Sequence, residues 1–182
     1  MASVSDDANA PNASGEADGA ASGPEGRSGA INLAGMIDES RILDLDATGK
    51  DEALERLIEA LATAPQVTDP KALREGILER EHTLSTGVGI GVAIPHVRLA
   101  SVKEFVIAIG RLGRGIDFGS LDRMPVRLIV MIAVPERQAR EYLNVVAALL
   151  KRLKEDATRR RIMFARTPKE IKAALVEASE DA

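Results

Sequence analysis

The stretch VRLIVMIAV, residues 126–134, is the clearest indicator of the fold. It is an almost unbroken run of β-branched and aliphatic residues of strand length, which is typical of a strand covered on both faces. A second run, EFVIAIGRL (104–112), has the same character, and RILDLD (41–46) alternates apolar and polar residues as a half-buried strand does. These three runs predict a sheet whose centre is buried.

Amphipathic stretches lie between these strands. TGKDEALERLIEALATA predicts a helix behind Thr48 as N-cap, with Asp51 three residues on. Its apolar face consists of Leu54, Leu57, Ile58 and Leu61. DPKALREGILEREH predicts a second helix that begins after Asp69, with proline in its first position, and runs to about Arg80.

The C-terminal third of the chain is also helical in pattern. ERQAREYLNVVAALLKRLKED shows an apolar stripe of Leu143, Val146, Leu150 and Leu153. ATRRRIMFAR predicts a short helix, and the cap, proline and acid of 167–170 predict a final helix to about Glu177. Strands alternating with helices predict an α/β fold: a single domain with a mixed, mostly parallel β-sheet flanked by helices on both faces.

Composition narrows the function classes. The 182 residues include 28 acidic and 24 basic side chains, a balance that gives no indication of nucleic-acid binding. Cysteine is absent, which excludes disulfides, thiolate zinc sites and cysteine nucleophiles, and two histidines leave little room for a histidine-rich metal site. We therefore expect no metal and no cofactor.

Residues 1–30 differ from the rest of the chain. They are rich in Ala, Gly and Ser, and they carry five acidic side chains against one arginine, so we expect a disordered acidic tail before a folded domain at 31–182. This stretch lacks the basic start and apolar core of a signal peptide, and no apolar run is long enough to cross a membrane. The expectation is a cytoplasmic protein without direct membrane insertion.

Three further features favour structural roles. The glycines of GVGIG (87–91) lack the third small residue of a dinucleotide fingerprint, and no Lys-Ser or Lys-Thr follows as in a P-loop. They are more simply explained as a tight backbone turn, although bare N–H groups there could face an anion. The run 159–161 of arginines has no interleaved aromatics and indicates a solvated helix start, and His82 is expected on the surface after a helix.

His96 is the main candidate for chemistry. It follows Pro95, which fixes φ and holds Ile94 extended, so the imidazole stands on a stiff segment. An ordinary histidine pKa of about 6.5 leaves a ring nitrogen free near neutrality. The alternative is a polar residue at the end of a strand. No Ser-His-Asp arrangement accompanies it, which weighs against a hydrolase that uses His96 as base.

The segment REHTLSTGVGIGVAIPHV (80–97) resembles the phosphorylation-site region of type-2 enzyme IIA domains of the phosphoenolpyruvate-dependent phosphotransferase system, the fructose/mannitol type and their nitrogen-regulatory relatives. The resemblance covers roughly residues 33–178. The matching residues of the motif are Arg80, Glu81, Ser85, Thr86, Gly87, Ala93, Ile94, Pro95 and His96.

The resemblance implies a phosphocarrier rather than a multiple-turnover enzyme. In that pattern His96 accepts a phosphoryl group from the histidine-containing phosphocarrier protein and passes it to an enzyme IIB, or holds it as a mark read by a regulated protein. Arg80 would stabilise the phosphoryl oxygens. Ser85, Thr86 and the N–H of Gly87 would supply further phosphate-binding donors. Because no sugar channel is attached, a regulatory role in nitrogen or carbon metabolism is favoured.

Two positions depart from the family's pattern. Val97 stands where a small residue usually follows the histidine, and Tyr142 stands where the family usually presents a second histidine. A phenol with a pKa of about 10 is a poor proton exchanger near pH 7 and does not become a cation. The alternative hypothesis is therefore a non-catalytic, protein-binding domain that has lost efficient phosphotransfer.

Overall fold

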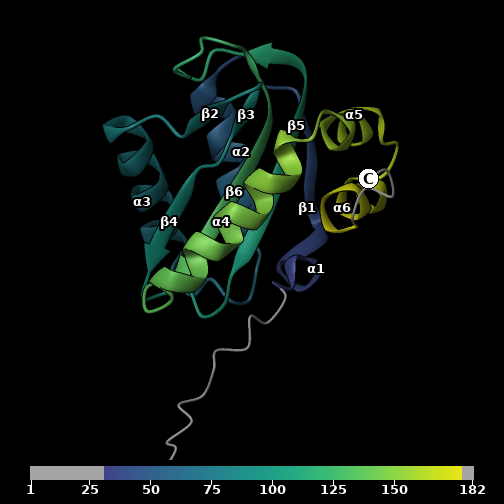
Figure 1. Cartoon of the computed structure of the whole chain (residues 1–182). Helices are drawn as coiled ribbons and strands as arrows, with labels where there is room; N and C mark the ends of the chain where they lie inside the picture. Colours follow the sequence, from purple (N-terminus) through teal and green to yellow (C-terminus); the bar gives the residue numbers. More distant parts are fainter. Residues whose placement is uncertain (1–30, 178–182) are drawn as a thin grey trace, which may run out of the picture. The chain divides into compact units, whose positions relative to one another are not determined.

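The computed structural model describes residues 31–177, and it shows one mixed sheet with helices on both faces (Figure 1). The strands run in the order β1-β5-β6-β3-β2, and β4 also pairs with β6. Their bounds are β1 Ile37–Leu45, β2 Gly87–Gly89, β3 Val92–Ala93, β4 His96–Leu99, β5 Val106–Ile116 and β6 Val126–Pro135. The pairs β1–β5, β3–β6 and β4–β6 are parallel, whereas β5–β6 and β2–β3 are antiparallel. The predicted single α/β domain is confirmed.

The central strand β6 divides the core into two layers. Ile129 and Met131 point into the layer formed with α2 (Lys50–Ala62) and α3 (Pro70–Thr83). Val130 and Ile132 point into the layer formed with α1 (Leu33–Met36), α4 (Ala139–Lys154), α5 (Asp156–Phe164) and α6 (Pro168–Val176). In Figure 1, α4 crosses in front of the sheet and α2 lies behind it. A strand covered on both faces has no polar face, which explains its continuous apolar sequence.

Two predicted helix starts are confirmed. The Asp69 carboxylate accepts from the N–H of Ala72 at 3.0 Å at the start of α3, and Thr167 Oγ1 accepts from the N–H of Glu170 at 3.2 Å at the start of α6. Each helix begins with proline, whose missing N–H would have had no helical acceptor. The first of these caps fixes where α3, which borders the functional site, begins.

The cap predicted for α2 and the predicted end of α3 are wrong. Gly49 is the N-cap of α2, and the N–H and hydroxyl of Thr48 donate to Glu52 instead of pairing with Asp51. The Glu52 carboxylate, one position after Asp51, completes the turn equally well, and Gly49 tolerates the backbone conformation of an N-cap. Helix α3 continues to Thr83, so His82 lies exposed in its last turn rather than after it.

The phase of α4 and the lengths of two strands also differ from prediction. Leu143 is 64 % exposed, and the residues of α4 that are buried are Val145, Leu149 and Leu153. The buried residues of α4 recur every four positions, so the face that packs on the core is rotated from the predicted stripe. Strand β1 begins at Ile37 and β5 runs to Ile116, because backbone pairing carries both strands past their apolar runs.

No helix within residues 31–177 is long and apolar enough to cross a membrane. The predicted acidic tail at 1–30 lies outside the described residues.

Candidate functional site

A pocket of about 850 Å³ opens at the outer edge of β4. Within residues 31–177, strand β4 pairs only with β6, so its other edge is left open between α3 on one face of the sheet and α4 on the other. The pocket is lined by Gly76, Glu79, Arg80 and Thr83 of α3, by all of β4, and by Glu136, Ala139, Tyr142 and Leu143. Successive turns of two helices therefore face a short edge strand that begins with His96.

The proline before the histidine separates β3 from β4. Both strands pair in parallel with β6, and the carbonyl of Pro95 accepts the N–H of Ile132 at 2.9 Å. In a parallel pair, every second residue of a strand directs its backbone groups toward the neighbouring strand. The carbonyl of Leu99, which accepts from the N–H of Glu136 at 3.2 Å, therefore faces β6 as the carbonyl of Pro95 does. The backbone groups of His96 and Arg98 consequently face the open edge.

The contacts of His96 define which ring nitrogen is available. Its Nδ1 lies 3.1 Å from the carbonyl oxygen of Ile94. Because a carbonyl only accepts, Nδ1 carries the hydrogen in the neutral ring and the lone pair resides on Nε2. Burial lowers the pKa of His96 below its ordinary value, and the nearby cations Arg80 and Arg98 lower it further against the opposing effects of Ile94 and Glu81. Near neutral pH the imidazole is a neutral nucleophile held by a backbone acceptor.

Arg80 and Tyr142 enter the pocket from the two helices that border it. Within residues 31–177, no hydrogen bond or ion pair occupies the Arg80 guanidinium, which lines the pocket beside His96. The Tyr142 ring contacts the imidazole with centroids 4.9 Å apart and planes tilted by 34°. Burial raises the pKa of the Tyr142 hydroxyl, so this group is a neutral phenol near pH 7. The pocket thus combines a nucleophile, an unengaged cation and a neutral hydroxyl.

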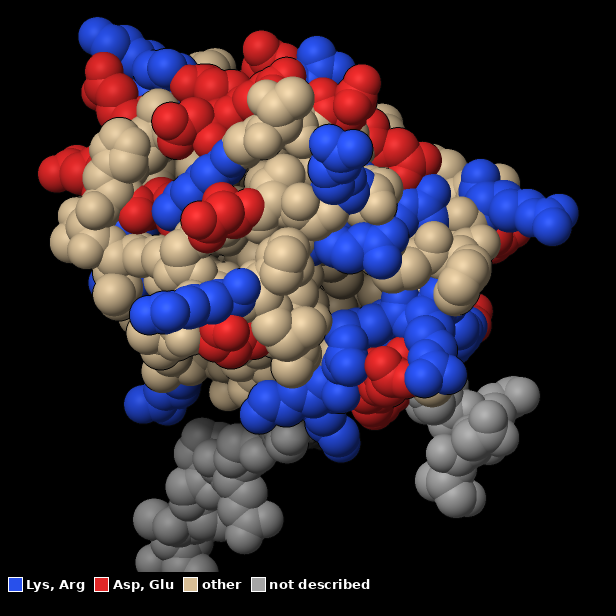
Figure 2. Space-filling view, turned by 90° about the horizontal axis from the view of Figure 1, so that it is seen from above, with Lys and Arg blue, Asp and Glu red and all other residues tan. Residues whose placement is uncertain are grey.

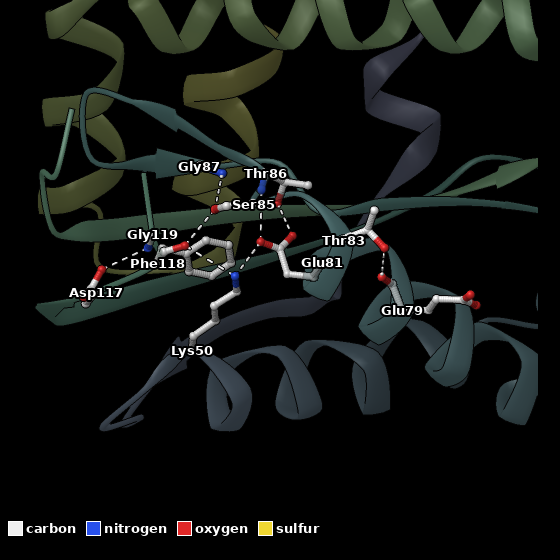
Figure 3. A network of polar contacts seen from close by, with 10 residues as sticks. All are labelled: Lys50, Glu79, Glu81, Thr83, Ser85, Thr86, Gly87, Asp117, Phe118 and Gly119. Atoms are coloured by element: carbon white, nitrogen blue, oxygen red, sulfur yellow. Dashed lines mark hydrogen bonds and ion pairs between the residues drawn. The ribbon is translucent and has the colours of Figure 1, made fainter. Parts of the chain in front are cut away.

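The loop predicted to bind phosphate lies elsewhere. Ser85, Thr86 and Gly87 are not among the residues that line the pocket, and Figure 3 shows their donors engaged with other groups. The hydroxyl of Ser85 donates to the carbonyl of Phe118 at 2.7 Å and accepts from the N–H of Gly87 at 3.3 Å. The N–H and hydroxyl of Thr86 both donate to Glu81, at 3.0 and 2.5 Å. That these three residues bind phosphate stays a prediction.

A buried ion pair anchors this loop. Glu81 is buried near the C-terminal end of α3, and Lys50 Nζ at the start of α2 lies 2.8 Å from its Oε1 (Figure 3). The same ammonium lies 4.8 Å from the centre of the Phe118 ring. Burying a carboxylate requires partners of this kind. We call Lys50, Glu81 and Thr86 the Glu81 cluster; it joins α2, α3 and the loop before β2.

The glycine turn has the structural role that the sequence favours. Gly89, Ile90 and Gly91 all have positive φ, of 83°, 54° and 74°, as a tight two-residue hairpin between β2 and β3 requires. The N–H of Ile90 donates to Asp122 at 2.9 Å, which ties the hairpin to the loop before β6. This turn returns the chain into β3 and so delivers it to His96.

Arg98 and Gly76 are site residues that sequence reasoning missed. Arg98 is two residues after His96 in the same strand, and this spacing places both side chains on one side of β4, a signal available from the sequence. Gly76 is one helical turn before Arg80 and faces Val97. This contact could not be predicted, because it depends on how α3 packs against the sheet. In the described part of the chain, no group of His, Cys, Asp or Glu residues is placed to hold a metal ion.

Comparison with known proteins identifies the family. Residues 36–178 match the family model described as phosphoenolpyruvate-dependent sugar phosphotransferase system, EIIA 2. The chain belongs to this family. It is 33 % identical over 131 residues to the fructose-specific EIIA component of Haloferax volcanii, an alignment that covers 72 % of this chain and 85 % of that protein.

Two solved structures share the fold of this enzyme IIA domain. The nitrogen regulatory protein IIA-Ntr from Neisseria meningitidis has a TM-score of 0.73 and 30 % identity, covering 79 % of this chain and 98 % of that one. Enzyme IIA-mannitol of Escherichia coli, in its complex with phosphorylated enzyme IIB-mannitol, has a TM-score of 0.66 and 22 % identity, covering 76 % and 96 %. Family membership supports a phosphocarrier or regulatory role in the phosphotransferase system, and the second of these structures adds the fold alone.

Proposed function

We propose that this protein is a phosphohistidine carrier in which Nε2 of His96 accepts a phosphoryl group from the histidine-containing phosphocarrier protein. The observation that carries the proposal is the hydrogen bond from Nδ1 to the Ile94 carbonyl, 3.1 Å long, in an open pocket next to an unengaged arginine. It leaves one nucleophilic nitrogen and fixes the direction in which the ring is held. Family membership supports the same donor class.

The proposed step is an in-line transfer between two imidazoles. The Nε2 lone pair of His96 forms the new bond to phosphorus while the N–P bond of the donor's phosphohistidine breaks. The electron pair of that bond stays on the donor's ring nitrogen, and the phosphorylated imidazole of His96 keeps its hydrogen on Nδ1. A neutral acceptor nitrogen suits a loose transition state in which positioning and charge stabilisation dominate.

The surroundings of His96 fit the charge that the phosphoryl group brings. In the proposed role the Arg80 guanidinium binds two phosphoryl oxygens with its planar fork, and the positive charge of Arg98 makes the potential in the pocket more favourable for an anion. The N–H of Arg98, turned toward the free edge of β4, is a further donor. Tyr142 donates one hydrogen bond but cannot supply the positive charge of a second histidine.

We propose a regulatory role for the phosphorylated form, in the cytoplasm, with an enzyme IIB or a regulated protein as the next partner. A second candidate function is a protein-binding domain without efficient transfer. The specific observation in its favour is the Tyr142 ring packed 4.9 Å from the imidazole, since a phenol cannot relay a proton near pH 7 as a histidine does.

The test is incubation of the protein with phosphoenolpyruvate and the purified general phosphotransferase proteins, followed by intact mass spectrometry. We expect one added phosphoryl group on the wild type and none on His96→Ala, with His82→Ala as the matched control that remains phosphorylated. An unmodified wild type, or a phosphoryl group that persists in His96→Ala, rejects the carrier.

The second candidate function makes a different prediction. A partner isolated with the wild-type protein should then bind His96→Ala with unchanged affinity, because no transfer chemistry is involved. Loss of that binding on His96→Ala would count against it.

A further inference from the structure

Helix α3 and strand β4 make a tight contact at Gly76. A Cβ atom added to Gly76 would lie 2.7 Å from Cγ2 of Val97 and 3.7 Å from Cδ2 of Leu99. Real Cβ atoms are essentially never found below 3.0 Å from a neighbour. The valine has little freedom to yield, because a β-branched side chain is stiff at χ1 and because Val97 packs on the α2–α3 core. Helix α3 therefore approaches β4 this closely only with glycine at 76.

This contact adjoins both the nucleophile and the cation of the site along the chain. Val97 directly follows His96 in β4. Arg80 is one turn after Gly76, and both residues line the same pocket together with Glu79 and Thr83. Side chains four residues apart on a helix move together when the helix shifts. The separation of the α3 backbone from Val97 therefore sets the reach of Arg80 toward His96.

We propose that Gly76 is a positioning residue, which seats α3 against Val97 and thereby holds Arg80 at the distance from Nε2 of His96 that a phosphoryl group needs. The inference rests on the proposed function and deepens it. It also assigns a role to Val97: a branched side chain after the histidine is accommodated because the facing helix offers no side chain at that point.

The opposite end of α3 is held independently. Glu81 pairs with Lys50 at 2.8 Å, and its carboxylate also accepts from Thr86. A methyl group at position 76 therefore cannot be relieved by moving the whole helix away; α3 must tilt about the anchor at Glu81, and because Arg80 directly precedes Glu81, this tilt turns the Arg80 side chain away from its direction toward His96. Since a misplacement of 1 Å costs up to about 100-fold in rate, a partial displacement of the guanidinium should cost about tenfold.

The experiment measures the rate at which His96 is phosphorylated in Gly76→Ala, Val97→Ala, Arg80→Ala and their pairwise combinations. We expect Gly76→Ala to be about tenfold slower than the wild type. Adding Val97→Ala should return the rate to within about threefold, because the clashing Cγ2 is gone. In the Arg80→Ala background, Gly76→Ala should have no further effect. Gly113→Ala, where an added Cβ meets nothing within 4 Å, is the matched control.

A second readout needs no phosphorylation. NMR titration of the His96 ring reports its electrostatic surroundings, and Arg80 is one of the charges that lower its pKa. Gly76→Ala should raise the midpoint in the same direction as Arg80→Ala, and Val97→Ala should restore it. If the wild type accepts no phosphoryl group but these shifts occur, the proposed function fails and the positioning role stands.

Other outcomes overturn the positioning role. A rate and a titration midpoint in Gly76→Ala equal to those of the wild type would do so, as would losses that add fully to those of Arg80→Ala. If Gly76→Ala does not fold by circular dichroism, the Gly76→Ala/Val97→Ala protein must fold; failure of that double variant also rejects the contact as the cause.

Discussion

Arg80 and Glu81 are neighbours on α3, yet they serve two regions with opposite electrostatic character. Glu81 is 3 % exposed, and its carboxylate is satisfied by Lys50 and by two donors of Thr86. Arg80 is half-buried in the pocket of His96, where no hydrogen bond or ion pair within the described residues engages its guanidinium. One region has its polar groups paired with each other, and the other keeps them available.

Within one short segment, Glu81 contributes to stability and Arg80 is available for chemistry. Paired buried groups define a rigid structure, because leaving one unpaired costs its full desolvation. An unpaired cation next to a nucleophile stabilises charge that arrives from outside. Figure 2 shows acidic side chains concentrated toward the top of that view and basic ones toward the right and the bottom, with charges of both signs intermixed. Substitutions in the two regions should therefore affect different measurements.

The largest effect is expected for Glu81→Ala. The variant leaves Lys50 without its carboxylate and removes the acceptor of both Thr86 donors, so the free energy of unfolding should fall by about 3 to 5 kcal/mol. Chemical denaturation followed by circular dichroism measures this loss. Glu75→Ala is the matched control on the same helix, because Glu75 is exposed and forms only a 3.8 Å surface pair with Lys71. Equal stabilities of the two variants would contradict a structural role for the cluster.

Arg80→Ala should give the reverse pattern. Loss of the guanidinium should slow phosphorylation of His96 by about 10² to 10³-fold, as removal of a charge-stabilising donor does elsewhere, while the unfolding free energy changes by less than about 1 kcal/mol. Stopped reactions analysed by intact mass give the rate. Arg74→Ala, on the same helix but paired with Glu55, is the control that should keep the full rate. A large loss of stability in Arg80→Ala would contradict the prediction, because Arg80 would then have a structural role like that of Glu81.

Sequence patterns predicted the sheet because β6 has no polar face to obscure its period. They predicted the starts of α3 and α6 because Asp69 and Thr167 carry their own capping oxygens. They misplaced the face of α4, because Leu143 continues the apolar period although it is exposed and lines the pocket beside β4. The apolar period alone does not say which of its residues pack on the core.

The candidate site shows the same division. His96 could be singled out from the sequence because proline stiffens the segment before it, whereas Arg80 is named only through the resemblance of residues 80–97 to the enzyme IIA phosphorylation-site region. The structure places both residues in one pocket. The sequence could not predict that the hydroxyls of Ser85 and Thr86 are already hydrogen-bonded. Their acceptors, on Phe118 and Glu81, reach the loop only through tertiary packing. The pairing of Gly76 with Val97 is equally invisible, since nothing local relates α3 to β4.

The pH dependence of phosphorylation is expected to be a smaller effect. Because burial and nearby arginines lower the pKa of His96, its ring stays mostly neutral at pH 6.5, where an ordinary histidine is half protonated. The rate of phosphoryl acceptance should therefore change by less than about twofold between pH 8 and 6.5, and fall only below that. The test is to measure the rate across this pH range with the concentration of the phosphorylated donor held constant. A midpoint of the rate profile at or above pH 6.5 would contradict a pKa of His96 lowered by burial.

The same shift has a consequence for folding, with a definite sign. A histidine whose pKa is lower in the folded state binds its proton more readily when unfolded, so its contribution to stability is full above the ordinary pKa and is lost as pH falls toward the folded value. His96→Asn, which removes the titration, should flatten the pH dependence of the unfolding free energy below about pH 6.5.

A modest effect is expected at Tyr142, and it tests whether this residue belongs with the groups that are available for chemistry or with the packing residues. Tyr142→Phe keeps the ring that packs 4.9 Å from the imidazole and removes only the hydroxyl. If the hydroxyl donates one neutral hydrogen bond to the phosphoryl group, acceptance should slow by about two- to tenfold, the range that corresponds to 0.5–1.5 kcal/mol. Tyr142→His restores a group able to become a cation, so it should speed onward transfer to an acceptor more than acceptance itself. Single-turnover rates in both directions separate the two steps. A phenylalanine variant that matches the wild type in both steps would place Tyr142 among the packing residues and leave Arg80 as the main group that stabilises the transferred charge.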